Sequence, residues 1–189
     1  MNTADGGKNC LVGLGPASLH TLRGALERSL GEHAASLLQE TGCASGPEVY
    51  QAFAAWLQTR ANVADPADLD KTFLAQMMSE FFEATGWGDV ELEHLGDTVL
   101  ALDTSGWAEA NSDTTALAPS CHFTTGMLAA FMTELAGDAV AVMEVECLTC
   151  GGERCRFLMG SAATLHKVFE AIVRGENYGD VLAGASAAI

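Results

Sequence analysis

The amino-acid sequence predicts an α+β fold, in which an antiparallel sheet is packed with helices. Segments with apolar residues at helical spacing alternate with pairs of short β-type segments, and glycine-containing turns join the members of each pair. Strands that are joined by a short turn pair antiparallel. The length of 189 residues, of which 49% are hydrophobic and 18% charged, is typical of one globular domain, here residues 1–189.

Three helices are expected in the N-terminal part. Leucines recur at helical spacing over Ser18–Leu38, and Gly42 ends that pattern. A Gly-Pro pair then introduces a shorter helix over Glu48–Thr59. The third helix, Asp65–Thr85, begins with a capping aspartate followed by a proline in the first turn.

Strands and helices alternate in the rest of the chain. The expected elements are a hairpin of Val90–Glu93 and Thr98–Asp103, a helix over Cys121–Leu135, a second hairpin of Asp138–Cys147 and Arg154–Met159, a helix over Ala162–Arg174, and one turn over Tyr178–Leu182. Residues 183–189 form a small-residue tail in this prediction, and 107–118 form a polar connection.

The charge excludes two classes of partner. The chain has 9 Lys and Arg against 25 Asp and Glu, so its formal net charge is −16. Nucleic acids and anionic membrane surfaces are polyanions and would repel it. No apolar run reaches the roughly 18 residues that a membrane span needs, and the first nine residues do not resemble a secretory leader. We therefore expect a cytoplasmic protein, whose thiols stay reduced.

Three of the six cysteines fall within nine residues, which predicts metal or redox chemistry. Cys147 and Cys155 are equidistant from Gly151, so a hairpin that turns there places them opposite each other, where two thiolates can share one zinc ion. Cys121 stands at a helix N-terminus, which favours a thiolate. The candidates for a fourth ligand are Glu144, Glu146, Cys150 and His122.

The spacing alone leaves the fourth ligand open. Glu144 and Cys147 are three residues apart and point to opposite faces of a regular strand, so Glu144 reaches the metal only through a bulge, a strong twist or an approach from the sheet edge. Cys147 and Cys150 form a Cys-x-x-Cys pair, which suits either a zinc knuckle or a redox couple. Inert buried thiols are a further alternative.

The segment Cys121-His-Phe-Thr-Thr-Gly126, followed by Glu144-x-x-Cys147 and Gly152-x-x-Cys155-Arg-Phe157, resembles the signature of the 4-vinyl reductase (hydrocarbon-binding) domain family. That family includes the sensor domains of phenol-responsive activators. The resemblance covers residues 107–182, the motif-bearing half. It implies a structural Zn²⁺ held by Cys121, Glu144, Cys147 and Cys155, although Cys150 has no counterpart in the usual pattern.

The resemblance also implies a fold similar to that of TRAPP vesicle-tethering subunits and haem nitric-oxide sensors, with an internal hydrophobic pocket, and a homodimer formed through N-terminal helices. We expect the pocket to be lined by apolar residues near the motif, although those at helical spacing are equally typical of an ordinary core. These candidate ligand-binding residues are Phe73, Met77, Phe81, Trp107, Phe123 and Met127.

The expected function is a zinc-stabilised sensor or carrier domain for an apolar or aromatic small molecule. The sequence contains neither a dinucleotide fingerprint nor an acid–base constellation, which argues against a self-sufficient enzyme. An accessory or reductase-type protein of (bacterio)chlorophyll biosynthesis and a dimeric interaction scaffold are the alternatives.

Overall fold

The computed structural model describes residues 11–96, 98–111 and 116–186, and these form an antiparallel sheet with helices on both faces. The strands are β1 (Glu91–Leu95), β2 (Val99–Thr104), β3 (Ala141–Glu146) and β4 (Cys155–Gly160). They lie in the order β1-β2-β4-β3, with every neighbouring pair antiparallel. Both predicted hairpins and the α+β class are confirmed.

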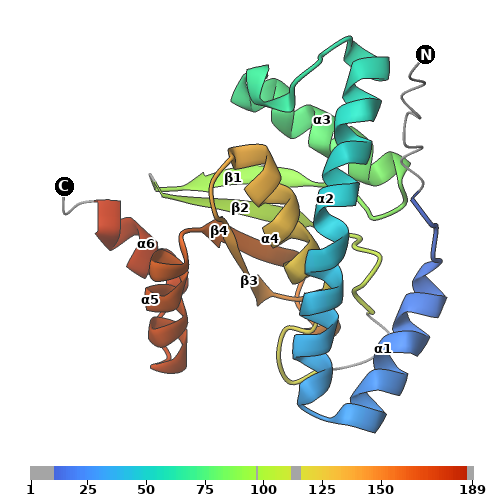
Figure 1. Ribbon diagram of the computed structural model, residues 1–189. Helices are drawn as coiled ribbons and strands as arrows, with labels where there is room; N and C mark the ends of the chain where they lie inside the picture. The colour runs from blue at the N-terminus through green and yellow to red at the C-terminus, as the bar shows by residue number, and fades with distance from the viewer. Residues whose placement is uncertain (1–10, 97, 112–115, 187–189) are drawn as a thin grey trace.

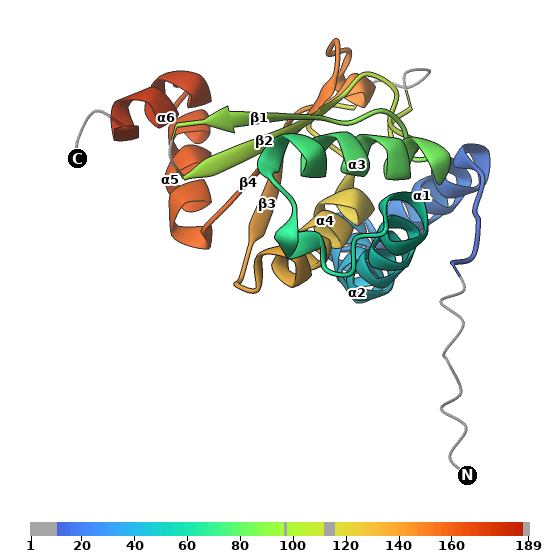
Figure 2. The same ribbon diagram turned by 90° about the horizontal axis from the view of Figure 1, so that it is seen from above.

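The helices form one layer on each face of this sheet (Figures 1 and 2). Helices α2, α3 and α4 pack on one face, α5 and α6 pack on the other, and α1 lies against α2. The helices are α1 (Pro16–Leu30), α2 (His33–Ala61), η1 (Pro66–Asp68), α3 (Lys71–Ala84), α4 (His122–Ala136), η2 (Leu148–Cys150), α5 (Ala162–Val173) and α6 (Tyr178–Ser186).

Alternation along the strands divides the apolar residues between two cores. On β4, Phe157 and Met159 point into the larger core beneath α2, α3 and α4, whereas Leu158 points into a smaller core beneath α5 and α6. The same alternation holds on β2 for Leu102 and Ala101. The sheet therefore has two buried faces, and a change of face decides which helices a side chain meets.

The predicted boundary between the first two helices is wrong. The chain breaks at Gly31, whose φ of +56° suits glycine, and α2 then runs for 29 residues through Gly42 and Pro47. The sequence pattern was misleading because Gly42 is a contact residue rather than a terminator.

Glycines allow α2 and α4 to approach each other closely. A Cβ on Gly42 would lie 2.0 Å from the backbone oxygen of Phe123, and one on Gly126 would lie 2.0 Å from the backbone oxygen of Gln39. Gly46 lies just as tightly against α4, because its Cβ would be 2.4 Å from the Cβ of Ala130. Both helices thus keep glycine where their backbones touch.

Two further helix boundaries differ from the prediction. Asp65 caps the short helix η1 by accepting a hydrogen bond from the Ala67 N–H, while Asp70 accepts from the N–H groups of Thr72 and Phe73 and begins α3. At the other end of the chain, α6 extends to Ser186 and so includes part of the predicted tail. Residues 187–189 of that tail lie outside the described residues.

Within the described ranges, no helix has both the length and the apolar character that a membrane crossing requires.

Replacing Gly126 by Ala is expected to lower the free energy of unfolding by about 1–3 kcal/mol, because the new methyl group meets backbone atoms that have no room to move. Urea denaturation of the two proteins measures this difference. Gly24→Ala is the matched control on α1, where the nearest atom to a new Cβ is the flexible end of Arg28 at 3.2 Å. This control should be neutral or stabilising. Equal stabilities of Gly126→Ala and the unaltered protein would contradict the close contact.

Candidate metal centre

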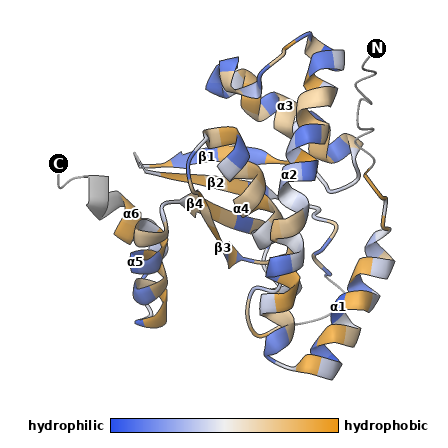
Figure 3. Cartoon of the chain, viewed as in Figure 1, coloured by the Kyte–Doolittle hydropathy of each residue, from blue (hydrophilic) through white to orange (hydrophobic). Residues whose placement is uncertain are grey.

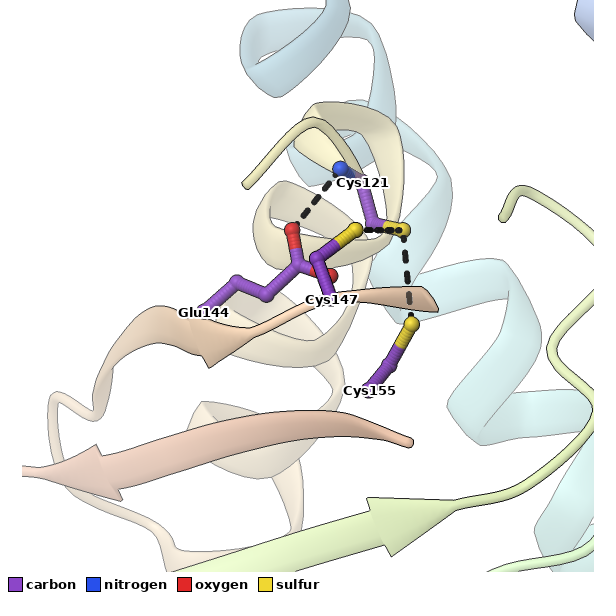
Figure 4. Close-up of side chains that lie close together, drawn as sticks. All are labelled: Cys121, Glu144, Cys147 and Cys155. Carbon is purple, nitrogen blue, oxygen red and sulfur yellow. Dashed lines mark hydrogen bonds between the residues drawn. The ribbon is translucent and has the colours of Figure 1, made fainter. Parts of the chain in front are cut away.

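Four potential metal ligands from three parts of the chain converge at one point (Figure 4). Cys121 precedes α4, Glu144 lies on β3, Cys147 follows β3, and Cys155 begins β4. Their ligand atoms all lie within 4.8 Å of one another. The Sγ atom of Cys121 is 4.0 Å from both other sulfur atoms, close to the roughly 3.8 Å expected between two thiolates on one tetrahedral zinc.

A bulge in β3 brings Glu144 and Cys147 to the same face of the sheet. Glu144 pairs with Phe157 and Glu146 with Arg156, so one residue, Val145, is extra in β3. Val145 packs into the smaller core, and Glu146 also points to that face. The strand therefore returns to the face of Glu144 at Cys147. The predicted conflict between these two residues is resolved by one of the routes that the sequence left open.

The turn after β3 holds the sulfur of Cys155. The backbone oxygen of Cys147 accepts hydrogen bonds from the N–H groups of Cys150 and Gly152, at 3.0 and 3.2 Å. This turn directs the N–H of Leu148 to the Sγ atom of Cys155, at 3.4 Å. A backbone donor on the sulfur favours the thiolate, which is the form that binds a metal.

Glu144 carries the clearest sign that a cation belongs here. Its Oε2 atom accepts a hydrogen bond from the Cys121 N–H at 2.9 Å, but its buried Oε1 atom has no hydrogen-bond partner among the described residues. Burial, together with the neighbouring Cys147, raises the pKa of Glu144 to about 8. A buried carboxylate oxygen without a partner is costly, and a metal ion at the centre of the cluster would satisfy it.

The thiols of the metal-free cluster form a chain of donors and acceptors. The pKa of Cys121 is raised chiefly because its thiol shares hydrogen bonds with Cys147 and Cys155, and burial raises it further. The pKa of Cys147 is lowered by hydrogen bonds from Cys121 and Cys155. One thiolate is thus favoured before a metal arrives, while binding of a metal would release the remaining protons. Three sulfur donors and one oxygen suit a tetrahedral ion such as zinc.

The structure separates the other candidates for a fourth ligand. Glu146 lies on the opposite face, where Arg154 and Tyr178 bind its carboxylate, so it cannot reach the cluster. His122 and Cys150 are half-buried and stand outside the group of four. Cys150 nevertheless lies beside Cys147, and burial followed by that neighbour raises the pKa of Cys150 to about 11.

Glu109, which the sequence did not single out, caps the helix that bears Cys121. Cys121 occupies the N-cap position of α4 but makes no capping hydrogen bond with its side chain. The buried carboxylate of Glu109 instead accepts from the N–H groups of Phe123 and Thr124, at 3.0 and 2.7 Å. Burial raises the pKa of Glu109, and these hydrogen bonds oppose that rise. The capping role is therefore supplied from elsewhere, and the Cys121 thiol is free for the cluster.

A second polar contact ties α1 to the same region. The buried side chain of Arg23 donates to the backbone oxygen of Glu109 and to the hydroxyl oxygen of Ser120, at 3.1 and 3.4 Å. His20 lies 3.0 Å from the backbone oxygen of Ala108. No local sequence signal indicates these contacts, because the partners of Arg23 are 86 and 97 residues away from it.

The six residues predicted to line an apolar pocket all belong to the larger core. Those that are fully buried are Met77, Phe81, Trp107 and Met127, and those half-buried against them are Phe73 and Phe123. Trp87 connects two of the aromatic residues, because it stacks on Trp107 at 5.4 Å and on Phe123 at 6.0 Å between ring centroids. None of the six lines the two cavities found between described residues, so their role in binding stays a prediction.

The comparisons with known proteins agree with the motif. Residues 110–161 match the family model of the 4-vinyl reductase domain, which confirms the resemblance that the cysteine and glutamate spacing indicates. Comparison with curated proteins gives no match.

Three solved structures resemble the chain. The phenol-responsive sensory domain of the transcription activator PoxR, crystallised with phenol, gives a TM-score of 0.63 at 21% identity, over 79% of this chain and 76% of that one. A trafficking protein particle complex subunit 3 from Naegleria fowleri, covalently bound to palmitic acid, gives 0.60 at 10% identity, over 77% and 91%. A vinyl-4-reductase family protein from Methanocaldococcus jannaschii gives 0.41 at 19% identity, over 59% and 66%. The first two share the fold of this chain.

Glu109→Gln is expected to lower the free energy of unfolding by about 1–3 kcal/mol, because the amide offers one acceptor to two buried N–H donors. Binding of Co²⁺ should also weaken by about tenfold or more, since a displaced helix N-terminus moves Cys121. Urea denaturation and a cobalt titration measure the two effects. Glu134→Gln, at an exposed position on α4, is the control. Unchanged stability and cobalt affinity in Glu109→Gln would contradict the capping role.

Proposed function

We propose that this chain is a zinc-stabilised small-molecule-binding domain, a sensor or carrier for an apolar or aromatic ligand. The observation that carries the zinc is the convergence of three thiols and Glu144, whose buried Oε1 atom has no partner among the described residues. Zinc bound there would join β3, β4 and the start of α4. The thiol ligands must be reduced, which supports the cytoplasmic location that the sequence predicts.

The zinc would be structural rather than catalytic. Cys121, Cys147 and Cys155 are buried, and with Glu144 they supply four ligands, which fill a tetrahedral shell. A catalytic zinc keeps one position open for water or substrate. The contribution of the metal would therefore be to the free energy of folding, and the protein would bind its ligand elsewhere.

Binding of a small molecule is supported by the fold and by the composition of the larger core. The fold is shared with a sensory domain that was crystallised with phenol. We propose that the ligand enters among the six core residues predicted from the sequence. Met77 and Met127 lie there with aromatic residues, and the flexible thioether side chain of methionine repacks easily around a guest.

A homodimer formed through the N-terminal helices is the proposed assembly. Apolar side chains remain exposed along α1 and its surroundings (Figure 3), and the large ones are Leu11, Val12, Leu14, Leu22, Leu30 and Leu37. An apolar surface of this kind favours a protein partner, and a second copy would cover the same surface on both subunits. Sedimentation velocity tests this proposal, which a monomer at high protein concentration would contradict.

Protein that is purified without added metal is expected to contain about one zinc per chain, because a complete thiolate-rich shell binds zinc tightly. Cys155→Ser should lose most of the zinc and unfold at a lower temperature. Elemental analysis and thermal unfolding measure these effects. Cys43→Ser, which alters an exposed cysteine on α2, is the control and should retain both properties.

The same preparations test the fourth ligand. In the Co²⁺-substituted protein, Cys150→Ser should leave the thiolate-to-cobalt absorption unchanged if Glu144 is the ligand, and should reduce it by about one quarter if Cys150 completes a four-thiolate shell. Zinc far below one per chain, with every thiol freely titratable, would overturn the zinc proposal.

Phenol is expected to raise the unfolding temperature of the zinc-loaded protein in a saturable manner, since a ligand that binds the folded state stabilises it. The ¹³C-methyl NMR signals of Met77 and Met127 should shift with the same saturation curve, because both residues lie in the proposed pocket. A phenol titration that leaves these two methyl signals and the unfolding temperature unchanged would contradict binding in the core.

A further inference from the structure

A separate cavity lies at the open edge of the sheet, next to a residue of the candidate metal centre. Its volume is about 320 Å³, and residues of α2, α4, β3 and α5 line it. Four consecutive residues of β3, 142–145, contribute to its wall, and they include Glu144. The cavity thus extends along the free side of an edge strand and contacts the strand from which Glu144 reaches the cluster.

The side of the cavity formed by α5 is apolar. Phe169 and Ile172 line it, although 53% and 38% of their surfaces remain exposed. The rest of α5 follows the usual pattern, with Leu165 and Val168 buried in the smaller core. Two large exposed apolar side chains that face a cavity provide a surface for an apolar or aromatic group.

The side formed by α2 and α4 is polar. It contains the amide of Gln39, the imidazole of His122 and the hydroxyl of Thr125. The Thr125 hydroxyl donates to the backbone oxygen of Cys121 at 2.8 Å, which leaves its oxygen able to accept. The half-buried ring of His122 carries two nitrogen atoms, of which one donates and the other accepts when the ring is neutral, so it can serve either kind of ligand group.

The edge of β3 is poorly suited to another strand. The bulge at Val145 interrupts the regular spacing of its N–H and C=O groups, and bulges of this kind disfavour the addition of a strand. The volume, at the lower end of the usual range for ligand pockets, instead fits a small molecule. The ligand must place its apolar part against α5 and its polar part against α4.

We propose that this cavity binds a small amphipathic molecule, an aromatic ring that carries one hydrogen-bonding group, with the ring between Phe169 and Ile172 and the polar group at His122 and Thr125. The inference deepens the proposed function, on which it rests for the class of ligand, and it adds a site apart from the core pocket. The ligand would contact the strand that holds Glu144, so its binding and that of the metal would influence each other.

The experiment uses 4-fluorophenol as the probe with the full, zinc-loaded chain. Its ¹⁹F signal should broaden and shift saturably, and the ¹³C-methyl signal of Met143, which lines the cavity, should follow the same curve. Ile172→Trp fills the cavity and should weaken binding by about tenfold or more. Val173→Trp is the matched control, because Val173 is a neighbouring exposed residue of α5 outside the lining, and binding to it should stay within about twofold of that to the unaltered protein.

The outcomes separate this inference from the proposed function. Phe169→Ala, which removes one wall at an exposed position, is the second variant and should also weaken binding, with no change in the far-ultraviolet circular dichroism. A shift of Met77 and Met127 without Met143, and equal affinity in Ile172→Trp, would overturn the cavity site and leave the proposed function intact. No saturable binding of 4-fluorophenol by the unaltered chain would overturn both.

Discussion

The start of α4 is the point on which the candidate metal centre depends. Four N–H groups at a helix N-terminus need acceptors, and here two buried carboxylates meet that need: Glu109 accepts from the N–H groups of Phe123 and Thr124, and Glu144 accepts from that of Cys121. The usual capping side chain is replaced by a thiol that points into the cluster. One helix end thus fixes the position of the first cysteine, orients the glutamate by its Oε2 atom, and leaves the Oε1 atom for a cation.

The sequence predicted the members of this site better than their setting. The spacing of Cys147 and Cys155 about Gly151 was sufficient to place them opposite each other, because the geometry of a hairpin is local. Glu144 required the resemblance to a family, since strand parity opposed it, and the deciding bulge depends on how Val145 packs beneath α5. Glu109 could not be predicted at all, because its partners lie across the fold and no spacing rule connects them.

The fold shows the same division between local and distant causes. The hairpins, α4 and α5 follow from periodicity and from turn residues. The division of the first 61 residues did not, because glycine has two uses that look alike in one sequence. At Gly31 it permits a positive φ and ends α1, whereas at Gly42 it lets another backbone approach, and α2 continues. Only the position of α4 distinguishes these uses, and α4 is distant in the chain.

The close contact between α2 and α4 also has a mechanical consequence. Backbone atoms that touch at Gly42, Gly46 and Gly126 cannot slide past each other, so the two helices move as one rigid body. With 29 residues, α2 is about 44 Å long (Figure 1). A small rotation at Cys121 is therefore magnified along a lever that ends near Asn62, far from the sulfur atoms. Any event that shifts the centre of the cluster by a few tenths of an ångström would be felt at the opposite end of the molecule.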